Sequence, residues 1–332
     1  MISLDNVSIK YGDLTVVRPL SLEIGQGEFF TLLGPSGCGK TTMLRAIAGF
    51  VPVAGGRIEI AGKDVTHVPA EKRDVGIVFQ NYALFPHMSV RENVAFGLKV
   101  ARRSRAEIGR EVDRILDVVG IAAQHDKKPA ALSGGQQQRV AIARSLVMGT
   151  EVLLFDEPLS NLDAQIRDDM RREIKALQRE LGFTAVFVTH DQEEALSMSD
   201  RLLVFNAGQV EQIGTARELY ETPDTPFVCR FVGSANRIGP RLAQRLGLDP
   251  GAEAYLRPEH LRIAPAGAAD ALSATVRDVD YVGPITRLYL DLDGEPLQAQ
   301  CFSGPAVSDL APGQTVRLSL DRDRINLFAA AA

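Results

Sequence analysis

Residues 34–41 combine glycines with a lysine and a threonine at a spacing that could bind phosphate. They read GPSGCGKT, match the pattern GxxxxGK[ST], and lie between a predicted strand and a predicted helix. Glycines let backbone N–H groups converge on phosphate oxygens, and the N-terminus of a helix adds positive partial charge. We expect Lys40 to reach the β- and γ-phosphates of a nucleotide and the Thr41 hydroxyl to bind magnesium. The alternative is a chance glycine-rich turn with a surface lysine.

Two adjacent carboxylates follow another apolar run. Asp156 ends the run at 152–155, and Glu157 and Pro158 come directly after it. At the C-terminal edge of a parallel sheet, Asp156 suits a second contact to magnesium. Glu157 is then free to orient and deprotonate a water that attacks the γ-phosphate. An acidic pair at a helix N-terminus is the alternative, and the nearby glycine-rich segment favours the catalytic interpretation.

The elements that must position these residues form an α/β domain up to about residue 235. Short apolar runs alternate with longer segments of helical spacing, which is typical of a mostly parallel sheet. We predict strands at 29–33, 75–79, 152–155 and 185–188, and helices at 91–100, 106–120, 135–148, 164–181 and 191–198. Gly120 and Gly182 stand where helix C-caps are expected.

The chain changes character after Gly233. Helix formers become scarce, Pro and Gly recur about every ten residues, and short alternating segments such as 286–292 appear. This pattern predicts a small all-β barrel. We therefore expect two domains, residues 1–235 and residues 236–332.

Composition and charge exclude several classes of protein. The 332 residues are 45% hydrophobic and 24% charged, with a formal net charge of −5, so no nucleic-acid partner is expected. No run of 18 or more apolar residues occurs, and the first residues do not resemble an export signal. Cys38, Cys229 and Cys301 lie far apart outside any CxxC spacing, which favours a reducing cytoplasm over a disulfide or zinc site.

Residues 132–136 add a second potential anion-binding helix N-terminus. They read LSGGQ and open a predicted helix after a loop that contains proline. With the GPSGCGKT segment, Asp156 and Glu157, and the triplet Thr189, His190 and Asp191, residues 1–235 closely resemble the ATP-binding subunits of ABC transporters. The resemblance implies a P-loop NTPase domain of the ABC type, with a mixed sheet and a helical subdomain, which hydrolyses ATP with Mg²⁺.

The resemblance also implies a role for each motif residue. The catalytic residues are Glu157, His190 and Gln80, and the magnesium ligands are Thr41, Gln80 and Asp156. The ATP-binding residues are Tyr11, which resembles the aromatic that stacks on adenine, and Gly34, Pro35, Ser36, Gly37, Cys38, Gly39, Lys40, Thr41 and Thr42. The signature residues that face a partner subunit's ATP are Leu132, Ser133, Gly134, Gly135 and Gln136, and Asp163 belongs to the loop that links the two active sites. A buried tyrosine at a strand end and a structural histidine are the alternatives for Tyr11 and His190.

Partners are implied in the same way. ATP is expected between two copies of the chain, which form a head-to-tail homodimer on the inner face of the cell membrane. Residues 81–90, NYALFPHMSV, are apolar and aromatic, and in the family this region receives an integral-membrane permease. A turn packed into the core is the alternative. A periplasmic or extracellular solute-binding protein is an indirect partner.

The C-terminal portion points to import. Residues 233–237, 256–263 (LRPEHLRI) and 281–286 resemble the OB-like regulatory (TOBE-type) domain of solute-importer ATPases. Polyamine, ferric iron or phosphonate is favoured as solute over sugar or sulfate. A soluble ABC ATPase that acts on DNA or ribosomes is the alternative, but the interval from Gln80 to Leu132 is too short for a coiled-coil insertion. Glu157 and His190 argue against a nucleotide-binding module without turnover.

Cys38 stands inside the phosphate-binding segment. A helix N-terminus tends to lower the pKa of a thiol, so we expect Cys38 to be reactive. Alkylation is then expected to inactivate the protein, and ATP is expected to protect it.

Overall fold

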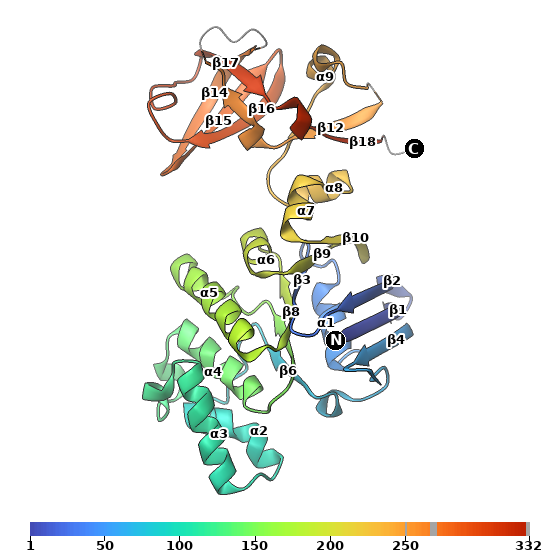
Figure 1. Ribbon diagram of the computed structural model, residues 1–332, viewed down its shortest axis with the longest axis vertical. Helices are drawn as coiled ribbons and strands as arrows, with labels where there is room; N and C mark the ends of the chain where they lie inside the picture. The colour runs from blue at the N-terminus through green and yellow to red at the C-terminus, as the bar shows by residue number, and fades with distance from the viewer. Residues whose placement is uncertain (250, 266–270, 330–332) are drawn as a thin grey trace. The chain divides into compact units, whose positions relative to one another are not determined.

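The computed structural model describes residues 1–249, 251–265 and 271–329, which form two compact units, Met1–Ala216 and Arg217–Ala332 (Figure 1). The boundary between the units falls earlier in the sequence than expected, because the residues after 216 group with the second unit. The domain limits 1–235 and 236–332 remain a prediction.

A mixed six-stranded sheet forms the centre of the first unit. Its order is β10-β9-β3-β8-β7-β6, with all neighbours parallel except β10, which runs antiparallel to β9. The strands are β3 Phe29–Leu33, β6 Val75–Val78, β7 Val152–Asp156, β8 Thr184–Thr189, β9 Arg201–Asn206 and β10 Gln209–Gly214. Every residue of β3, β7 and β8 is buried, as expected where both faces of a parallel sheet are covered. The four predicted strands are confirmed.

An antiparallel sheet that the sequence did not reveal lies beside the central sheet. Its order is β2-β1-β4-β5, with β1 Ile2–Tyr11, β2 Leu14–Ile24, β4 Gly55–Ile60 and β5 Lys63–Asp64. Its buried aliphatic side chains share one core with helix α1 (Lys40–Ala48) and with one face of the central sheet. This layer therefore backs the helix that follows residues 34–41.

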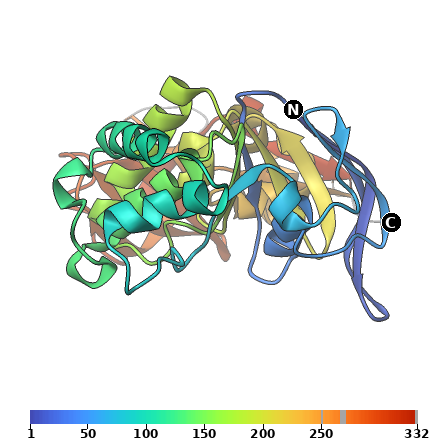
Figure 2. The same ribbon diagram turned by 90° about the horizontal axis from the view of Figure 1, so that it is seen from below.

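Helices cover the other side of the first unit. They are α2 Val90–Val100, α3 Arg105–Val118, α4 Gly134–Leu146, α5 Ala164–Leu181 and α6 Gln192–Met198, close to the predicted ranges. Ser89 and Ser133 begin α2 and α4 with capping boxes, and Gly182 ends α5 in the left-handed conformation. Figure 2 shows the teal and green helices on one side of this unit and the blue antiparallel strands on the other.

The second unit combines short helices with two antiparallel sheets. The helices are α7 Ala216–Glu221, α8 Pro226–Phe231 and α9 Pro240–Leu246. One sheet has the order β11-β12-β18 (Asn236–Arg237, Ala252–Leu256, Asn326–Ala329), and the other has the order β13-β17-β14-β15-β16 (Leu261–Ile263, Thr315–Leu320, Leu272–Val282, Ile285–Leu292, Glu295–Phe302). Helix α9 was not predicted. No helix in the described ranges has the length and apolar character to cross a membrane.

Candidate active site

The phosphate loop, residues 34–41, connects β3 to α1 and surrounds a buried lysine. Lys40 is only 3% exposed, and its Nζ donates hydrogen bonds to Gly34 O at 2.7 Å and Pro35 O at 2.8 Å. Gly39 begins α1 with a φ of 109°, which a side chain would strain. A Cβ at Gly34 would lie 2.2 Å from Phe205 O, so the close approach of the loop to β9 requires glycine. The loop thus holds one buried cation between its own backbone carbonyl groups.

Thr41 and Asp156 meet at the ends of α1 and β7. Thr41 Oγ1 donates to Asp156 Oδ1 at 2.9 Å, and Arg45, one turn further along α1, lies 3.4 Å from Asp156 Oδ2. A hydroxyl and a carboxylate are hard oxygen ligands of the kind that Mg²⁺ prefers, and Mg²⁺ takes its other ligands from water and phosphate. This pair of oxygen ligands therefore fits Mg²⁺, which needs only one or two ligands from the protein.

Glu157 and His190 form the next pair along the sheet edge. Glu157 Oε2 lies 3.2 Å from His190 Nδ1, and the two residues follow the adjacent parallel strands β7 and β8. Glu157 has a φ of 47°, an uncommon conformation for a side-chain-bearing residue, and its N–H donates to Val188 O. Strained residues of this kind concentrate at functional sites.

Gln80 approaches this edge through its backbone. It follows β6, and Asn161, which lies in the loop after β7, donates from Nδ2 to Gln80 O at 2.9 Å. The side chain of Gln80 is exposed. The structure therefore brings Gln80 beside the segment that carries Glu157 and Asp163.

Tyr11 lies at the tip of the β1–β2 hairpin. It pairs with Leu14 and is 53% exposed, which excludes a fully buried strand-end tyrosine. The β2 strand of this hairpin passes close to the phosphate loop, because a Cβ at Gly39 would lie 3.1 Å from Val16 O. The aromatic ring is thus exposed on an element that borders the phosphate-binding residues.

The signature residues form the N-terminus of α4, and Leu132 packs in a different hydrophobic cluster from Cys38 of the phosphate loop. Ser133 accepts from the N–H of Gln136, whose side chain accepts from the N–H of Ser133. A Cβ at Gly134 would lie 2.8 Å from Leu162, so this helix start packs against the loop before Asp163, which caps α5. Among the interactions described for the chain, no hydrogen bond or ion pair joins residues 132–136 to residues 34–42.

The expectation of a low pKa for Cys38 is wrong. Cys38 is 6% exposed, and burial raises the pKa of its thiol despite the nearby Lys40 ammonium, 3.8 Å away. The effect of burial on the pKa outweighs that of the Lys40 charge, because a buried thiolate lacks the water that would stabilise it. The helix N-terminus alone was a poor guide, since the sequence does not show whether the thiol points outwards.

Sequence reasoning also missed an arginine that links two loops. Arg167 of α5 donates from Nη2 to Leu162 O at 3.0 Å and from Nη1 to Asp191 Oδ2 at 3.3 Å. Asp191 in turn caps α6 and follows His190 directly. Arg45 could have been found from its position one turn after Thr41, but no local pattern signals Arg167.

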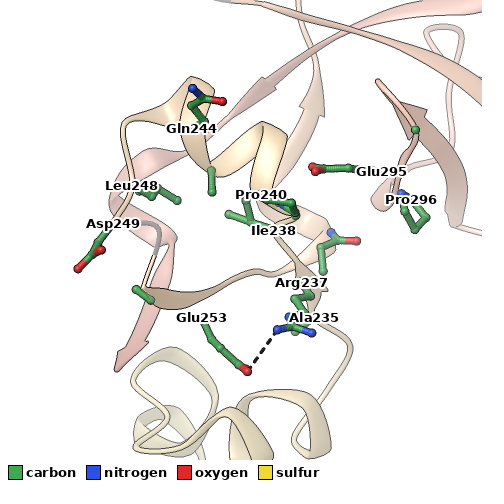
Figure 3. A pocket seen from close by; sticks show the side chains of 15 residues that line it. Ala235, Arg237, Ile238, Pro240, Gln244, Leu248, Asp249, Glu253, Glu295 and Pro296 are labelled. Carbon is green, nitrogen blue, oxygen red and sulfur yellow. Dashed lines mark hydrogen bonds and ion pairs between the residues drawn. The ribbon is translucent and has the colours of Figure 1, made fainter. Parts of the chain in front are cut away.

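A separate pocket lies in the second unit, between α9, β12 and the turn before β16, with a volume of about 820 Å³ (Figure 3). Its carboxylates already have partners. Glu253 pairs with Arg237 at 3.3 Å, and Glu295 accepts from the backbone N–H groups of Arg241 and Leu242 at the start of α9. The pocket therefore presents satisfied acidic groups and no catalytic arrangement.

The fold and this site define a P-loop nucleotide-binding ATPase. The family model described as ABC transporter matches residues 17–160, and the model described as TOBE domain matches residues 254–328. The chain belongs to the ATP-binding proteins of ABC transporters, because a relative named as such in Sinorhizobium fredii is 51% identical over 99% of this chain and 95% of its own length. The expected fold class, an ABC-type P-loop domain followed by an OB-like domain, is confirmed.

Other relatives carry more specific names. A spermidine/putrescine import ATP-binding protein of Acidothermus cellulolyticus is 49% identical, over 94% of this chain and 88% of that protein. A sulfate/thiosulfate import ATP-binding protein of Chromobacterium violaceum is 46% identical, over 97% and 94%. Among solved structures, cbiO1 of Clostridium perfringens, part of an ABC transporter complex, has a TM-score of 0.62 and 32% identity, over 66% of this chain and 89% of its own.

A second solved neighbour is an ATP-binding cassette dimer in a post-hydrolysis state with ADP and phosphate. It has a TM-score of 0.58 and 32% identity, and the match covers 65% of this chain and 99% of that chain. The chain is thus similar to a protein whose structure contains ADP and phosphate, the products of ATP hydrolysis.

Proposed function

We propose that this chain hydrolyses ATP at Glu157 to energise solute import through a separate membrane permease. The observation that carries the proposal is the order of side chains along one edge of the sheet. Thr41 contacts Asp156, and the next residue, Glu157, contacts His190. A magnesium position, a general base and a residue that orients the base are thus adjacent, as phosphoryl transfer to water requires.

The residues divide the work of hydrolysis. Lys40 and the backbone of the phosphate loop bind the β- and γ-phosphates. Thr41 and Asp156, with Gln80, would hold Mg²⁺, which neutralises charge on the phosphates when it is bound. Glu157 accepts the proton of the attacking water at a carboxylate oxygen, and His190 holds that carboxylate from Nδ1. Tyr11 stacks on the adenine.

A homodimer completes the site. The signature residues 132–136 lie apart from the phosphate loop within one chain, so each chain supplies two half-sites. They begin a helix, and the backbone N–H groups at a helix N-terminus can bind phosphate. The dimeric neighbour with ADP and phosphate supports this assembly. Asp163 belongs to the loop that links the two half-sites. The two subunits of the homodimer close on ATP and open after hydrolysis.

An apolar surface beside α2 suits the permease. Phe85 contacts Phe96 at 4.6 Å between ring centroids, and Phe96 is 37% exposed. Met148 is 42% exposed and lies against α2, because a Cβ at Gly97 would come within 2.5 Å of its sulfur. Exposed aromatic and methionine side chains favour protein contacts, so we place the permease here and the ATPase on the inner face of the membrane.

For the solute, polyamine is the leading candidate, and ferric iron and phosphonate remain in the proposal. The spermidine/putrescine relative supports polyamine, whereas the sulfate/thiosulfate relative is similar to nearly the same degree. The transported solute is selected by a solute-binding protein that acts with the permease. Polyamine import is therefore the version to test first.

Purification of the tagged chain from detergent-solubilised membranes, with ATP and vanadate present, tests the proposal. We expect mass spectrometry to identify a multi-spanning permease, and calorimetry on the associated binding protein to show spermidine or putrescine binding. A Lys40→Ala chain, which should not close on ATP, is the control. Recovery of only ribosomal, DNA-bound or other non-membrane proteins would favour the alternative of an ABC ATPase without a permease.

A further inference from the structure

The turn that follows Gln80 has an unusual backbone. Tyr82 and Ala83 have φ values of 60° and 46°, in the left-handed region that residues with side chains seldom adopt. Two such residues in succession persist only where surrounding contacts enforce the conformation. The position of Gln80, two residues earlier, therefore depends on what holds this turn.

Arg144 of α4 holds the turn by its two carbonyl groups. Its Nη1 donates to Ala83 O at 2.7 Å, and its Nη2 donates to Tyr82 O at 3.0 Å. The guanidinium also lies over the ring of Phe85, 5.7 Å from the centroid. A planar guanidinium matches two adjacent acceptors at once, and a lysine ammonium cannot reproduce that geometry.

Arg144 is partly buried, and burial lowers the pKa of its guanidinium. The hydrogen bond to Tyr82 O is partly buried, whereas the one to Ala83 O is exposed, and both end on backbone carbonyls instead of a carboxylate. The partly buried hydrogen bond is the more costly of the two to lose. The turn is thus fixed to the last part of α4.

Other elements bind the rest of the segment 80–85. Asn161 binds Gln80 O from the loop after β7, and Asn93 of α2 binds both the N–H and the carbonyl of Phe85. Arg144 adds α4, the helix that begins at the signature residues. A shift of α4 would therefore reach Gln80 through two carbonyl groups.

We propose that Arg144 is a positioning residue for Gln80, through which helix α4 sets the geometry of the Gln80 side chain. The inference rests on the role proposed for Gln80 in ATP hydrolysis. Loss of the two-pronged contact lets the left-handed turn relax and displaces the Gln80 amide from the magnesium and water positions. A displacement of about 1 Å can cost on the order of a hundredfold in rate, so even partial relaxation is measurable.

A double-mutant cycle in the full-length chain tests the inference. The variants are Arg144→Lys, Gln80→Ala and the double variant, with Arg139→Lys as the matched control, because Arg139 of the same helix binds Gly120 O and Glu173 instead of the turn. The ATPase rate is measured as a function of Mg²⁺ concentration, and ATP binding is measured without Mg²⁺.

We expect Arg144→Lys to lower kcat about tenfold and to raise the Mg²⁺ concentration for half-maximal rate. ATP binding without Mg²⁺ should stay unchanged, and Arg139→Lys should stay within about twofold of the wild type. Arg144→Lys should add little to Gln80→Ala, since residues that act through one another are not additive.

Two results would overturn the inference alone. They are a fully multiplicative double variant, or an Arg144→Lys chain with the Mg²⁺ dependence of the Arg139→Lys control. If Gln80→Ala itself leaves hydrolysis and its Mg²⁺ dependence unchanged, the role proposed for Gln80 fails first, and the inference fails with it.

Discussion

The Glu157 carboxylate and the His190 imidazole lie 3.2 Å apart, Oε2 to Nδ1, at the ends of two adjacent parallel strands. Because parallel strands end at the same edge, residues 33 positions apart in the sequence become partners without any further element. Asp156, the residue before Glu157, accepts a hydrogen bond from Thr41 and so connects the proposed base to the phosphate loop.

Arg73 holds the C-terminal end of α1 through hydrogen bonds. Its guanidinium is 5% exposed and donates to the carbonyls of Ala46 and Ile47 at the C-terminus of α1, and to Val68 O. Arg73→Met leaves these buried acceptors without donors, so we expect the free energy of unfolding to fall by about 3 kcal/mol. Urea denaturation measures the change. The exposed neighbour Lys72 provides the control, and an equal loss in Lys72→Met would contradict the account.

Cys38 should react slowly in the folded chain. Burial raises its thiol pKa, so less thiolate is present at pH 8 than at an exposed cysteine. We expect iodoacetamide to label Cys38 at least about tenfold more slowly in the native chain than in urea. Mass spectrometry of the labelled peptide follows the reaction, with Cys38→Ser to subtract Cys229 and Cys301. Faster labelling in the native state would show an activated thiol.

Glu194 gives stability a pH dependence of known sign. Burial raises its pKa above the ordinary value of 4.5, although its carboxylate accepts from Thr189 Oγ1 at 2.6 Å. The folded state therefore holds the proton longer than the unfolded state, and stability falls as the pH rises from 4.5 through the raised value. Below that range the penalty is absent.

Glu194→Gln isolates this effect, because the amide cannot ionise. We expect the stability of the wild type relative to Glu194→Gln to decline with rising pH and then to level off. Chemical denaturation at a series of pH values provides the curve. The exposed Glu193→Gln variant is the control, and a difference that grows with pH would reverse the assigned sign.

Much of the site could be predicted because its motifs are local. Each motif lies at the C-terminal end of a buried apolar strand, and strands of this kind stand out in the sequence. The motifs are the GPSGCGKT segment after β3, Asp156 and Glu157 at the end of β7, and His190 after β8. The central sheet then places them together without further information. Local motifs therefore predicted an α/β domain with a phosphate loop and the pair Asp156 and Glu157, and the resemblance to the ABC family supplied the remaining roles.

The missed features depend on contacts that no local pattern encodes. The β1–β2 pair has three register shifts, which interrupt the alternation by which strands are recognised. Arg144 donates to backbone carbonyls of a distant loop, so its partners carry no side-chain signal, and Arg167 pairs with Asp191 across 24 positions of the sequence. Cys38 was misjudged because burial decides its pKa, and burial is a property of the folded chain.

The ATPase rate of a Glu157→Gln chain tests the central claim most directly. Glutamine keeps the size of the side chain but cannot accept the proton of the attacking water. We predict a loss of about 10²–10⁴ in kcat with ATP binding retained, which is the range expected for removal of a general base. The control is Glu151→Gln, just before the other end of β7. A Glu157→Gln chain that hydrolyses ATP at the wild-type rate would contradict the account.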